Sequence, residues 1–522
     1  MPSPRPATVR PPLPLRQRDI APLPTATHLR WWQLFAACLT GLLIPLCFTG
    51  PAVVLPSISQ ALDGSAAQLN WIINGYILTY GSAMMVSGSL TDLIGPRRVW
   101  LWGLIWFSIV TLAIPWAPSV LWIDVLRLLQ GLGGAAAFAA AMSSLVPLFN
   151  GVARTRVFSL IGTTFGIGLA FGPLAAGALV DAASWHWIFW STGLIGVGGV
   201  VLVALSVKAS APADTGGLDW PGAITFTAAL ALFTYAILQA PEQGWRTAAV
   251  AGSLAAALVL FVAFVLIERH AARPMLDVSL FRRPRFVGVQ LLAASPAFLF
   301  IVLIVMLPGR LTGVDGYSAL VAGQMMVGLA APLLVVPVGA ALLARTFSTG
   351  HLAGAGLLLA AAGLAWMAHT PAAAWSMPMV MIGIGIGLPW GLMDAMAVSV
   401  VEPERAGMAT GIFNTVRISA DGVAIATIGA LTATLIQSDL LRALSGRVAD
   451  GAIVAAGNRM ALGELAQAVS LLPGQQALLL HSYDDAFRVV LYCMAALAVG
   501  VALTAFALLG GIHAHDAAPD AM

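Results

Sequence analysis

Long runs of apolar residues, separated by short polar stretches, follow one another along most of the chain. A run of about 18 or more such residues is long enough to cross the hydrocarbon core of a membrane as a helix. The alternating segments of about ten residues that build membrane β-barrels are not seen. The pattern therefore predicts an all-α polytopic membrane protein with fourteen spans. Their approximate ranges are 31–55, 68–89, 99–117, 119–141, 156–180, 186–206, 218–239, 248–267, 286–308, 318–342, 350–369, 376–399, 407–435 and 488–510.

Composition excludes several other classes of protein. Only 9% of the 522 residues are charged, whereas about a quarter are charged in an average soluble protein. The net charge is +3 and the arginines are scattered, so no basic tract indicates nucleic-acid binding. The lone lysine, Lys208, is not part of a phosphate-binding loop, which argues against an ATP-driven pump. The three cysteines and eight histidines show no ligand spacing, so we expect no metal site, no cofactor and no enzymatic centre.

The distribution of basic residues sets the expected orientation. An even number of spans places both termini on one side, and seventeen of the 25 basic residues fall on that side against six on the other. Under the positive-inside rule both termini are cytoplasmic. The six residues expected on the outer face are Arg246, Arg310, Arg442, Arg447, Arg459 and, at a boundary, Arg488.

Three polar segments lie outside the predicted spans. Residues 1–30 contain eight prolines and five arginines, a composition that favours a disordered cytoplasmic tail. The long segment 437–485 contains amphipathic patches and is expected to form a short helical hairpin on the outer face. A polar linker at 207–217 divides the first six spans from the rest.

The stretch "GSLTDLIGPRRV" is a charged island between the second and third spans. Its distinctive residues are Gly88, Leu90, Asp92, Gly95, Arg97 and Arg98. This loop resembles the loop signature of the major facilitator superfamily. The resemblance implies that the loop latches the two halves of the protein in one conformation. The alternative is a charge cluster that only fixes orientation.

Two further stretches carry the same resemblance. "LRLLQGLGGAAA" in the fourth span contains Arg127, Gln130 and Gly131, which match the buried-arginine pattern of the superfamily. "GTTFGIGLAFGPLAAG" in the fifth span is similar to the packing motif of its antiporters, although a generic glycine-rich seam is the alternative. The residues of that motif are Gly162, Gly166, Gly168, Gly172, Pro173 and Gly177.

Four further motifs follow one another along the chain: "GLDWPGA", "EQGW", "ERHAARPMLDVSLFRRPRF" and "YDDAF". Together they resemble the motifs of the fourteen-helix drug:proton antiporters, and the resemblance covers about residues 31–510. That resemblance implies two six-helix bundles joined by two extra helices. The expected divisions are a tail 1–30, an N-terminal bundle 31–206, a linker with two extra helices 207–285, a C-terminal bundle 286–510 that includes the hairpin 437–485, and a cytoplasmic tail 511–522. The chain departs from the family at Cys47, which stands where the family has an acid in span one.

Ionisable residues within predicted spans are the candidates for proton coupling, because such residues are costly in a bilayer. The candidates are Asp124, Arg127, Asp394, Arg417 and Asp421. Arg417 and Asp421 are four residues apart and are expected to pair on one helix face. An acid beside an arginine can exchange its proton when the pairing changes between states. The alternatives are fixed ion pairs, or a wetted helix end for Asp394.

A substrate cavity is expected near the midplane between the bundles. Polar, aromatic and methionine side chains on membrane helices are its candidate liners, although such residues also pack or face lipid. The candidates are Asn70, Asn74, Tyr76, Tyr80, Gln130, Gln324, Met325, Trp390, Met393 and Asn414.

The resemblance implies a monomeric exporter in the bacterial cytoplasmic (inner) membrane, driven by protons and acting on small amphipathic or cationic molecules. The alternative is a narrow exporter of one metabolite, natural product or siderophore. Expected partners are the substrate, protons and the lipid bilayer, with a periplasmic adaptor if the source is Gram-negative.

Overall fold

The computed structural model describes residues 27–145, 148–149, 151–208, 219–271, 276, 278–344, 346–401 and 406–511. Within these ranges the chain is almost entirely helical and contains no strand. Nearly all of the predicted tail 1–30 and of the tail 511–522, and most of the linker at 207–217, lie outside the described residues.

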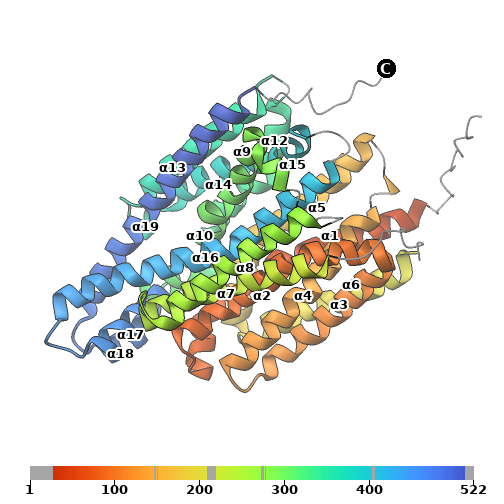
Figure 1. Ribbon diagram of the computed structural model, residues 1–522. Coiled ribbons are helices and arrows are strands. Elements are labelled where there is room, and N and C mark those ends of the chain that lie inside the picture. The colour runs from red at the N-terminus through yellow and green to blue at the C-terminus, as the bar shows by residue number, and fades with distance from the viewer. Residues whose placement is uncertain are drawn as a thin grey trace, which may run out of the picture.

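The first six helices form one bundle (Figure 1). They are α1 (Thr27–Leu62), α2 (Ala66–Ile94), α3 (Pro96–Ala113), α4 (Val120–Leu145), α5 (Gly151–Ala182) and α6 (His186–Ser206), with the 3-10 turn η1 (Ile114–Trp116) after α3. α2 begins at a capping box, in which Ser65 and Gln68 satisfy each other's backbone N–H groups. α2 packs along α4, and α1 packs along α5.

A second bundle follows α8 in the chain. It begins with one continuous helical segment, which consists of α9 (Pro284–Pro296), the π-helical turn η4 (Ala297–Ile301), α10 (Val302–Gly309) and the π-helical turn η5 (Arg310–Val314). The remaining long helices are α11 (Ala319–Ala330), α12 (Pro332–Leu343), α13 (Thr349–Met367), α14 (Ser376–Trp390), α15 (Met393–Ser399), α16 (Ala406–Leu444) and α19 (Gln476–Thr504). The short turns are η3 (Val278–Arg282), η6 (Ala372–Ala374) and η8 (Ala505–Leu509).

Twelve of the described helices are long and apolar enough to cross a membrane, or thirteen if the bent helix α5 counts as one span. The predicted number of fourteen spans is therefore not confirmed, although the observed number is close to it. The predicted span that is missing from this count is α2, a helix of 29 residues that carries Asn70, Asn74 and Thr79 along its length. These polar positions reduce its hydropathy, although it packs inside the bundle against α4.

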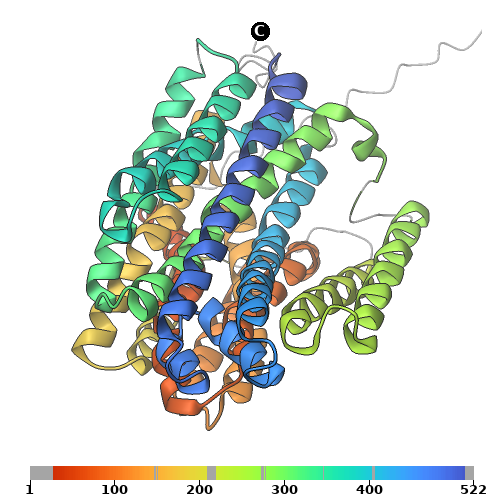
Figure 2. The ribbon, with the colours of Figure 1, turned by 90° about the vertical axis from the view of Figure 1, so that its left-hand side faces the viewer.

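The extra helices α7 (Trp220–Gln243) and α8 (Ala248–His270) form a pair at the side of the molecule (Figure 2). α7 contacts α2 of the first bundle and α16 of the second, so it covers the seam between them. Ile237 and Leu238 of α7 pack there against Ala426 and Ala430 of α16. α8 lies outside α7 and exposes most of its apolar surface.

Two short helices, α17 (Asp450–Ala461) and α18 (Leu465–Leu471), follow α16 and form a hairpin at the end of the molecule opposite the C-terminus (Figure 1). α16 and α19 extend further than expected, so the hairpin is shorter than 437–485. Its turn packs backbone to backbone on the second bundle: a Cβ at Gly309 would lie 2.7 Å from the Leu462 carbonyl oxygen. Only glycine permits so close an approach.

The same hairpin also binds the first bundle, at the turn between α1 and α2. Arg459 donates to the Gly64 carbonyl at 2.7 Å and pairs with the buried Glu464 at 2.9 Å. Gln467 donates to the Ser59 hydroxyl at 2.7 Å. Asp63, beside Gly64, has a φ of 49° and is the only non-glycine residue with positive φ in the described chain. The hairpin therefore joins the two bundles at this end.

The position of Arg310 differs from the prediction. It was expected in an outer loop, but it lies within the candidate span Pro284–Val314. Its guanidinium is buried and pairs with Asp315 at 3.0 Å and with Asp484 at 2.5 Å. Tyr483 and Phe487 of α19 lie within 5.1 and 5.4 Å of it, in cation–π geometry. The acids offset the cost of burying the charge, and the rings of "YDDAF" enclose it.

We expect Arg310→Ala to lower the free energy of unfolding by about 3 kcal/mol, because it leaves Asp315 and Asp484 without their cation. Thermal unfolding of the purified protein in detergent measures the change. Arg246→Ala, at an exposed arginine between α7 and α8, is the matched control and should leave the midpoint unchanged. An equal midpoint for both variants would contradict a stabilising role of the Arg310 cluster.

Candidate functional site

A buried guanidinium occupies the centre of the first bundle. Arg127 of α4 is fully buried, and its Nε donates to the Ile72 carbonyl of α2 at 2.6 Å. Its Nη2 donates to the Cys47 carbonyl of α1 at 2.5 Å, and its Nη1 donates to the Gln130 side chain. Gln130 in turn donates to the Thr111 hydroxyl of α3 at 2.7 Å. One arginine therefore connects four helices through neutral acceptors.

The acid nearest in sequence to this arginine is Asp124, one helical turn before it. Its side chain is 6% exposed, and its Oδ1 has no hydrogen-bond partner among the described residues. It lies within electrostatic range of Arg127, but the described part of the chain shows no ion pair between them. Burial of a carboxyl oxygen without a hydrogen-bond partner is energetically costly.

Two stacked tyrosines extend from the arginine toward the second bundle. The Arg127 guanidinium lies 4.5 Å from the centre of the Tyr76 ring. Tyr76 and Tyr80 stack with centroids 5.8 Å apart and planes only 7° apart. Tyr80 lies in electrostatic range of Arg417 and Asp421 of α16. The two tyrosines, one turn apart on α2, therefore lie between the ionisable groups of the two bundles.

In the second bundle the expected pairing between Arg417 and Asp421 is wrong. Arg417 instead lies 3.7 Å from Asp394 of α15, and its Nη2 donates to the Asn414 amide oxygen at 2.9 Å. Asp421 forms no ion pair within the described ranges. Spacing on one helix allowed the predicted pair, but the packing of α15 against α16 supplies a cross-helix partner. Asp394 remains well exposed, so the pair is open to solvent.

The glycines of α5 lie at contacts with two different helices. Gly168 and Gly172 face α1, where a Cβ at Gly168 would lie 3.0 Å from the Leu42 carbonyl oxygen. Gly166 and Gly177 face the second bundle, where a Cβ at Gly177 would lie 3.0 Å from the Leu320 amide nitrogen of α11. Pro173 lies next to Leu174, and the backbone of both meets Gly323 of α11. These small residues allow α5 to approach the second bundle closely.

Part of the charged island, which spans the end of α2 and the start of α3, is also described. Gly95 has a φ of 92°, which favours glycine, and ends α2 immediately before Pro96 begins α3. Arg97 donates to the Ala204 carbonyl of α6 at 3.2 Å, while Arg98 is exposed. A Cβ added at Gly88 would meet no other described atom within 4 Å. The side chain of Asp92, and the surroundings of Gly162 in α5, lie outside the described residues.

The candidate cavity liners do not all share one surface. Tyr76 and Gln130 belong to the Arg127 network, and Met393 is fully buried. Trp390 packs on Phe300 with ring centroids 6.3 Å apart. Gln324 is exposed on α11, and Met325 beside it is half-buried.

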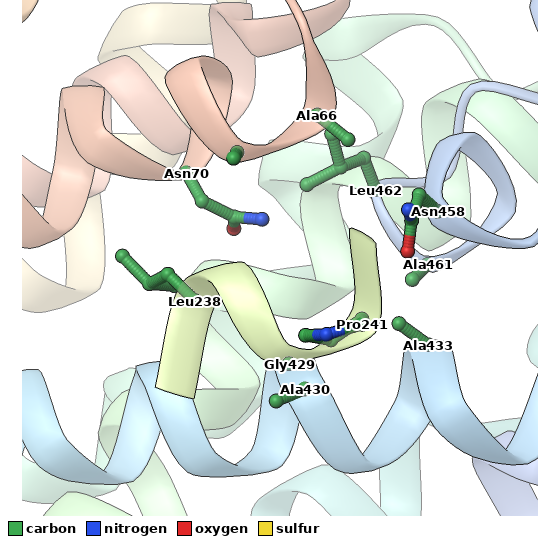
Figure 3. Close-up of a pocket in the computed structure, with 11 residues that line it drawn as sticks. Ala66, Asn70, Leu238, Pro241, Gly429, Ala430, Ala433, Asn458, Ala461 and Leu462 are labelled. Atoms are coloured by element: carbon green, nitrogen blue, oxygen red, sulfur yellow. The ribbon is translucent and has the colours of Figure 1, made fainter. Parts of the chain in front are cut away.

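Two asparagines of α2 lie closer to the hairpin end. Asn74 is fully buried, donates to the Asn70 carbonyl at 3.1 Å, and leaves its Oδ1 without a partner in the described chain. Asn70 lines a small pocket between α2, α7, α16 and α17 (Figure 3). The pocket's other labelled polar side chain is Asn458, which accepts from Gln437 at 2.6 Å. This pocket is too small and too far toward one end to be the expected midplane cavity.

Reasoning from sequence missed two parts of this arrangement. It treated Tyr76 and Tyr80 only as cavity liners and did not connect them with Arg127. It placed Arg459 in an outer segment without a partner in the first bundle. The one available signal was the spacing of Arg459 and Glu464 in an otherwise apolar hairpin.

Comparison with known proteins agrees with this architecture. The family model of the Major Facilitator Superfamily matches residues 37–424. A bacterial homologue of the human lysosomal transporter Spinster, solved in an inward-facing and unoccupied conformation, aligns with a TM-score of 0.65 at 17% identity. The alignment covers 95% of this chain and all of that one, and it shows a shared fold.

Curated relatives are similar over most of their length. A methylenomycin A resistance protein from Streptomyces coelicolor is 30% identical, over 72% of this chain and 79% of the relative. A cephamycin export protein from Amycolatopsis lactamdurans is 33% identical, over 74% and 81%. Multidrug resistance protein 3 from Bacillus subtilis is 26% identical, over 73% and 76%. The chain therefore belongs to the Major Facilitator Superfamily and, within it, to the drug efflux family that these relatives represent.

Proposed function

We propose that this protein is a proton-coupled exporter that moves small amphipathic or cationic compounds out of a bacterial cell by alternating access. The similarity to proteins named for antibiotic resistance and export, over most of both chains, supports export of a small molecule. The end that carries Arg97, Arg98 and Arg282 is then cytoplasmic, since basic residues concentrate there.

The Arg127 network supports proton coupling and carries this proposal. Cys47 stands at the span-one position of the missing acid, and the arginine uses its backbone carbonyl instead of a carboxylate. The buried acid in the same bundle is then Asp124, whose Oδ1 is unpartnered. A protonated Asp124 is compatible with the apolar surroundings, and release of that proton requires a conformation in which Arg127 or water reaches the carboxylate.

The second bundle supplies a more accessible set of ionisable groups. Arg417 is shared between Asp394 and Asn414, while Asp421 lies on the same helix without an ion pair within the described ranges. A proton or a cationic substrate that neutralises Asp394 or Asp421 would change the partner of Arg417. The Tyr76–Tyr80 stack lies between this set and Arg127, so a change in either bundle alters the packing at the other.

The contacts between bundles indicate which side is closed. At the hairpin end, Arg459 and Gln467 bind the α1–α2 turn, and Gly177 of α5 meets α11. In the proposed cycle, closure at this end corresponds to the state that opens toward the arginine-rich end. Export requires that these contacts break so that the substrate leaves at the hairpin end.

A narrow exporter of one natural product is the second candidate. Two of the compared relatives are named for a single antibiotic, methylenomycin A or cephamycin. The absence of an acid at Cys47 also removes one anionic group that would attract a dication. This candidate differs from the first in substrate range and shares its mechanism of coupling.

We expect Asp124→Asn to abolish gradient-driven export, because an amide of the same shape cannot carry the proton. The measurement is efflux of a fluorescent cationic dye from proteoliposomes with an imposed pH gradient, for the parent, Asp124→Asn, Asp421→Asn and Asp394→Asn. Asp450→Asn, at an exposed acid of the hairpin, is the matched control and should resemble the parent.

Different outcomes separate the alternatives in that experiment. Parent-like efflux by Asp124→Asn together with loss in Asp421→Asn or Asp394→Asn would move coupling to the second bundle. Parent efflux that does not respond to the pH gradient would contradict proton coupling. A well-inserted parent that moves no dye would favour the narrow exporter, and a panel of antibiotics and metabolites would then replace the dye.

The hairpin contacts give a conformational prediction. Arg459→Ala removes the hydrogen bond to Gly64 and leaves Glu464 without its cation, so the bundles should separate more often at this end. Spin labels at the exposed positions Gln60 of α1 and Asp450 of α17, in a protein with Cys493 replaced by serine, report the distance. The expected result is a longer and broader distance distribution. Arg442→Ala, at an exposed arginine of α16, is the control, and identical distributions for both variants would contradict a closing role of Arg459.

A further inference from the structure

A hollow with a volume of about 560 Å³ lies at the arginine-rich end of the second bundle. Its wall combines three arginines with apolar and small residues. The lining residues are Arg282, Arg283, Pro284, Arg285, Val400, Ala507, Leu508 and Gly511. None of the described residues that line the hollow is acidic.

The hollow lies at the level where membrane spans end. One candidate span begins at Pro284, another ends at Leu509, and a third ends at Ala397, shortly before Val400. Arg282 and Arg283 therefore stand just outside the apolar layer, while Ala507 and Leu508 stand just inside it. This is the depth at which phospholipid headgroups meet their acyl chains.

The arginines are held on a fixed segment. Leu280 of η3 and Phe286 of α9 are both fully buried and pack with Ala409 and Ile412 of α16. Phe281 meets Phe286 edge to face, with ring centroids 5.3 Å apart. The turn that carries Arg282 and Arg285 is therefore anchored to the bundle on both sides.

The charge at the hollow is not neutralised within the described protein. Arg282 and Arg285 are exposed, and neither forms an ion pair or a side-chain hydrogen bond with any described residue. Both arginines line the hollow together with the apolar side chains of Val400, Ala507 and Leu508. Arginine presents several N–H donors in a planar fork that matches phosphate oxygens.

We propose that this hollow binds the anionic headgroup of a membrane phospholipid, with the phosphate at Arg282 and Arg285 and the start of the acyl chains against Val400, Ala507 and Leu508. Basic pockets between membrane helices at the cytoplasmic side suit such lipids. A simple role in orientation would need positive charge at this end, but it would need neither an apolar wall nor a cavity.

The test is lipid retention by the purified protein in nanodiscs that contain phosphatidylglycerol in phosphatidylcholine, counted by native mass spectrometry. The parent should retain phosphatidylglycerol over phosphatidylcholine by about 25-fold, roughly fivefold for each of the two arginines. The double variant Arg282→Gln, Arg285→Gln should lose this preference, and the double variant Arg282→Lys, Arg285→Lys should keep most of it. The lysine variant separates loss of charge from misfolding.

The matched control is Arg246→Gln with Arg269→Gln, two exposed arginines outside the hollow. Equal lipid preference in the two glutamine double variants would overturn the proposal, because the arginines would then act only through general charge. Displacement of the lipid by millimolar glycerol phosphate would identify a free phosphate site instead. Stronger lipid retention after removal of residues 512–522 would identify the acidic C-terminal segment as the natural occupant and would also overturn it.

Discussion

A buried arginine charge is the constraint on which the first bundle depends. In an apolar solvent no water can solvate the Arg127 guanidinium, so the protein must surround it with acceptors. Its three acceptors are the backbone carbonyls of Cys47 in α1 and Ile72 in α2 and the side chain of Gln130 in α4, and Gln130 extends the network to Thr111 of α3. The helices therefore cannot move independently around this point. The first bundle is expected to rock as one body, which is what a transport cycle between two rigid halves requires.

The second bundle contains two arginines, Arg310 and Arg417, whose charges are compensated in different ways. Near the hairpin end, Arg310 has two acids and a ring of aromatic side chains, so its charge is fully compensated and fixed. At the other end of the same bundle, Arg417 has a partner at 3.7 Å in a side chain that is mostly exposed. A tight pair stabilises one structure, whereas a loose pair can change partners at low cost. Arg310 is therefore a buried charge held by acids on two segments, whereas the ion pair of Arg417 is accessible to solvent.

The sequence was sufficient for the helical architecture, since apolar runs, Ser65 and Pro96 mark helices through local chemistry. It was also sufficient to single out Arg127, because an arginine inside an apolar run is rare whatever surrounds it. It could not show that Arg417 pairs with Asp394 rather than Asp421, since helical spacing favours the neighbour on the same helix. Arg310 follows Pro308 and Gly309, which suggest the end of a span, but a π-helical turn continues the helix and carries the arginine inside.

The position of α7 has a consequence for how far the bundles can swing. α7 touches both bundles along the seam, so it must slip over at least one of them whenever the seam changes shape. The surface that α16 offers it includes the small residues Ala426, Gly429, Ala430 and Ala433. At the hairpin end of this contact, Gln437 of α16 donates to the Pro241 carbonyl of α7 at 2.9 Å and to Asn458 of the hairpin at 2.6 Å. One buried amide therefore connects α7, α16 and the hairpin, so displacement of α7 along this flank would involve the same side chain as release of the hairpin.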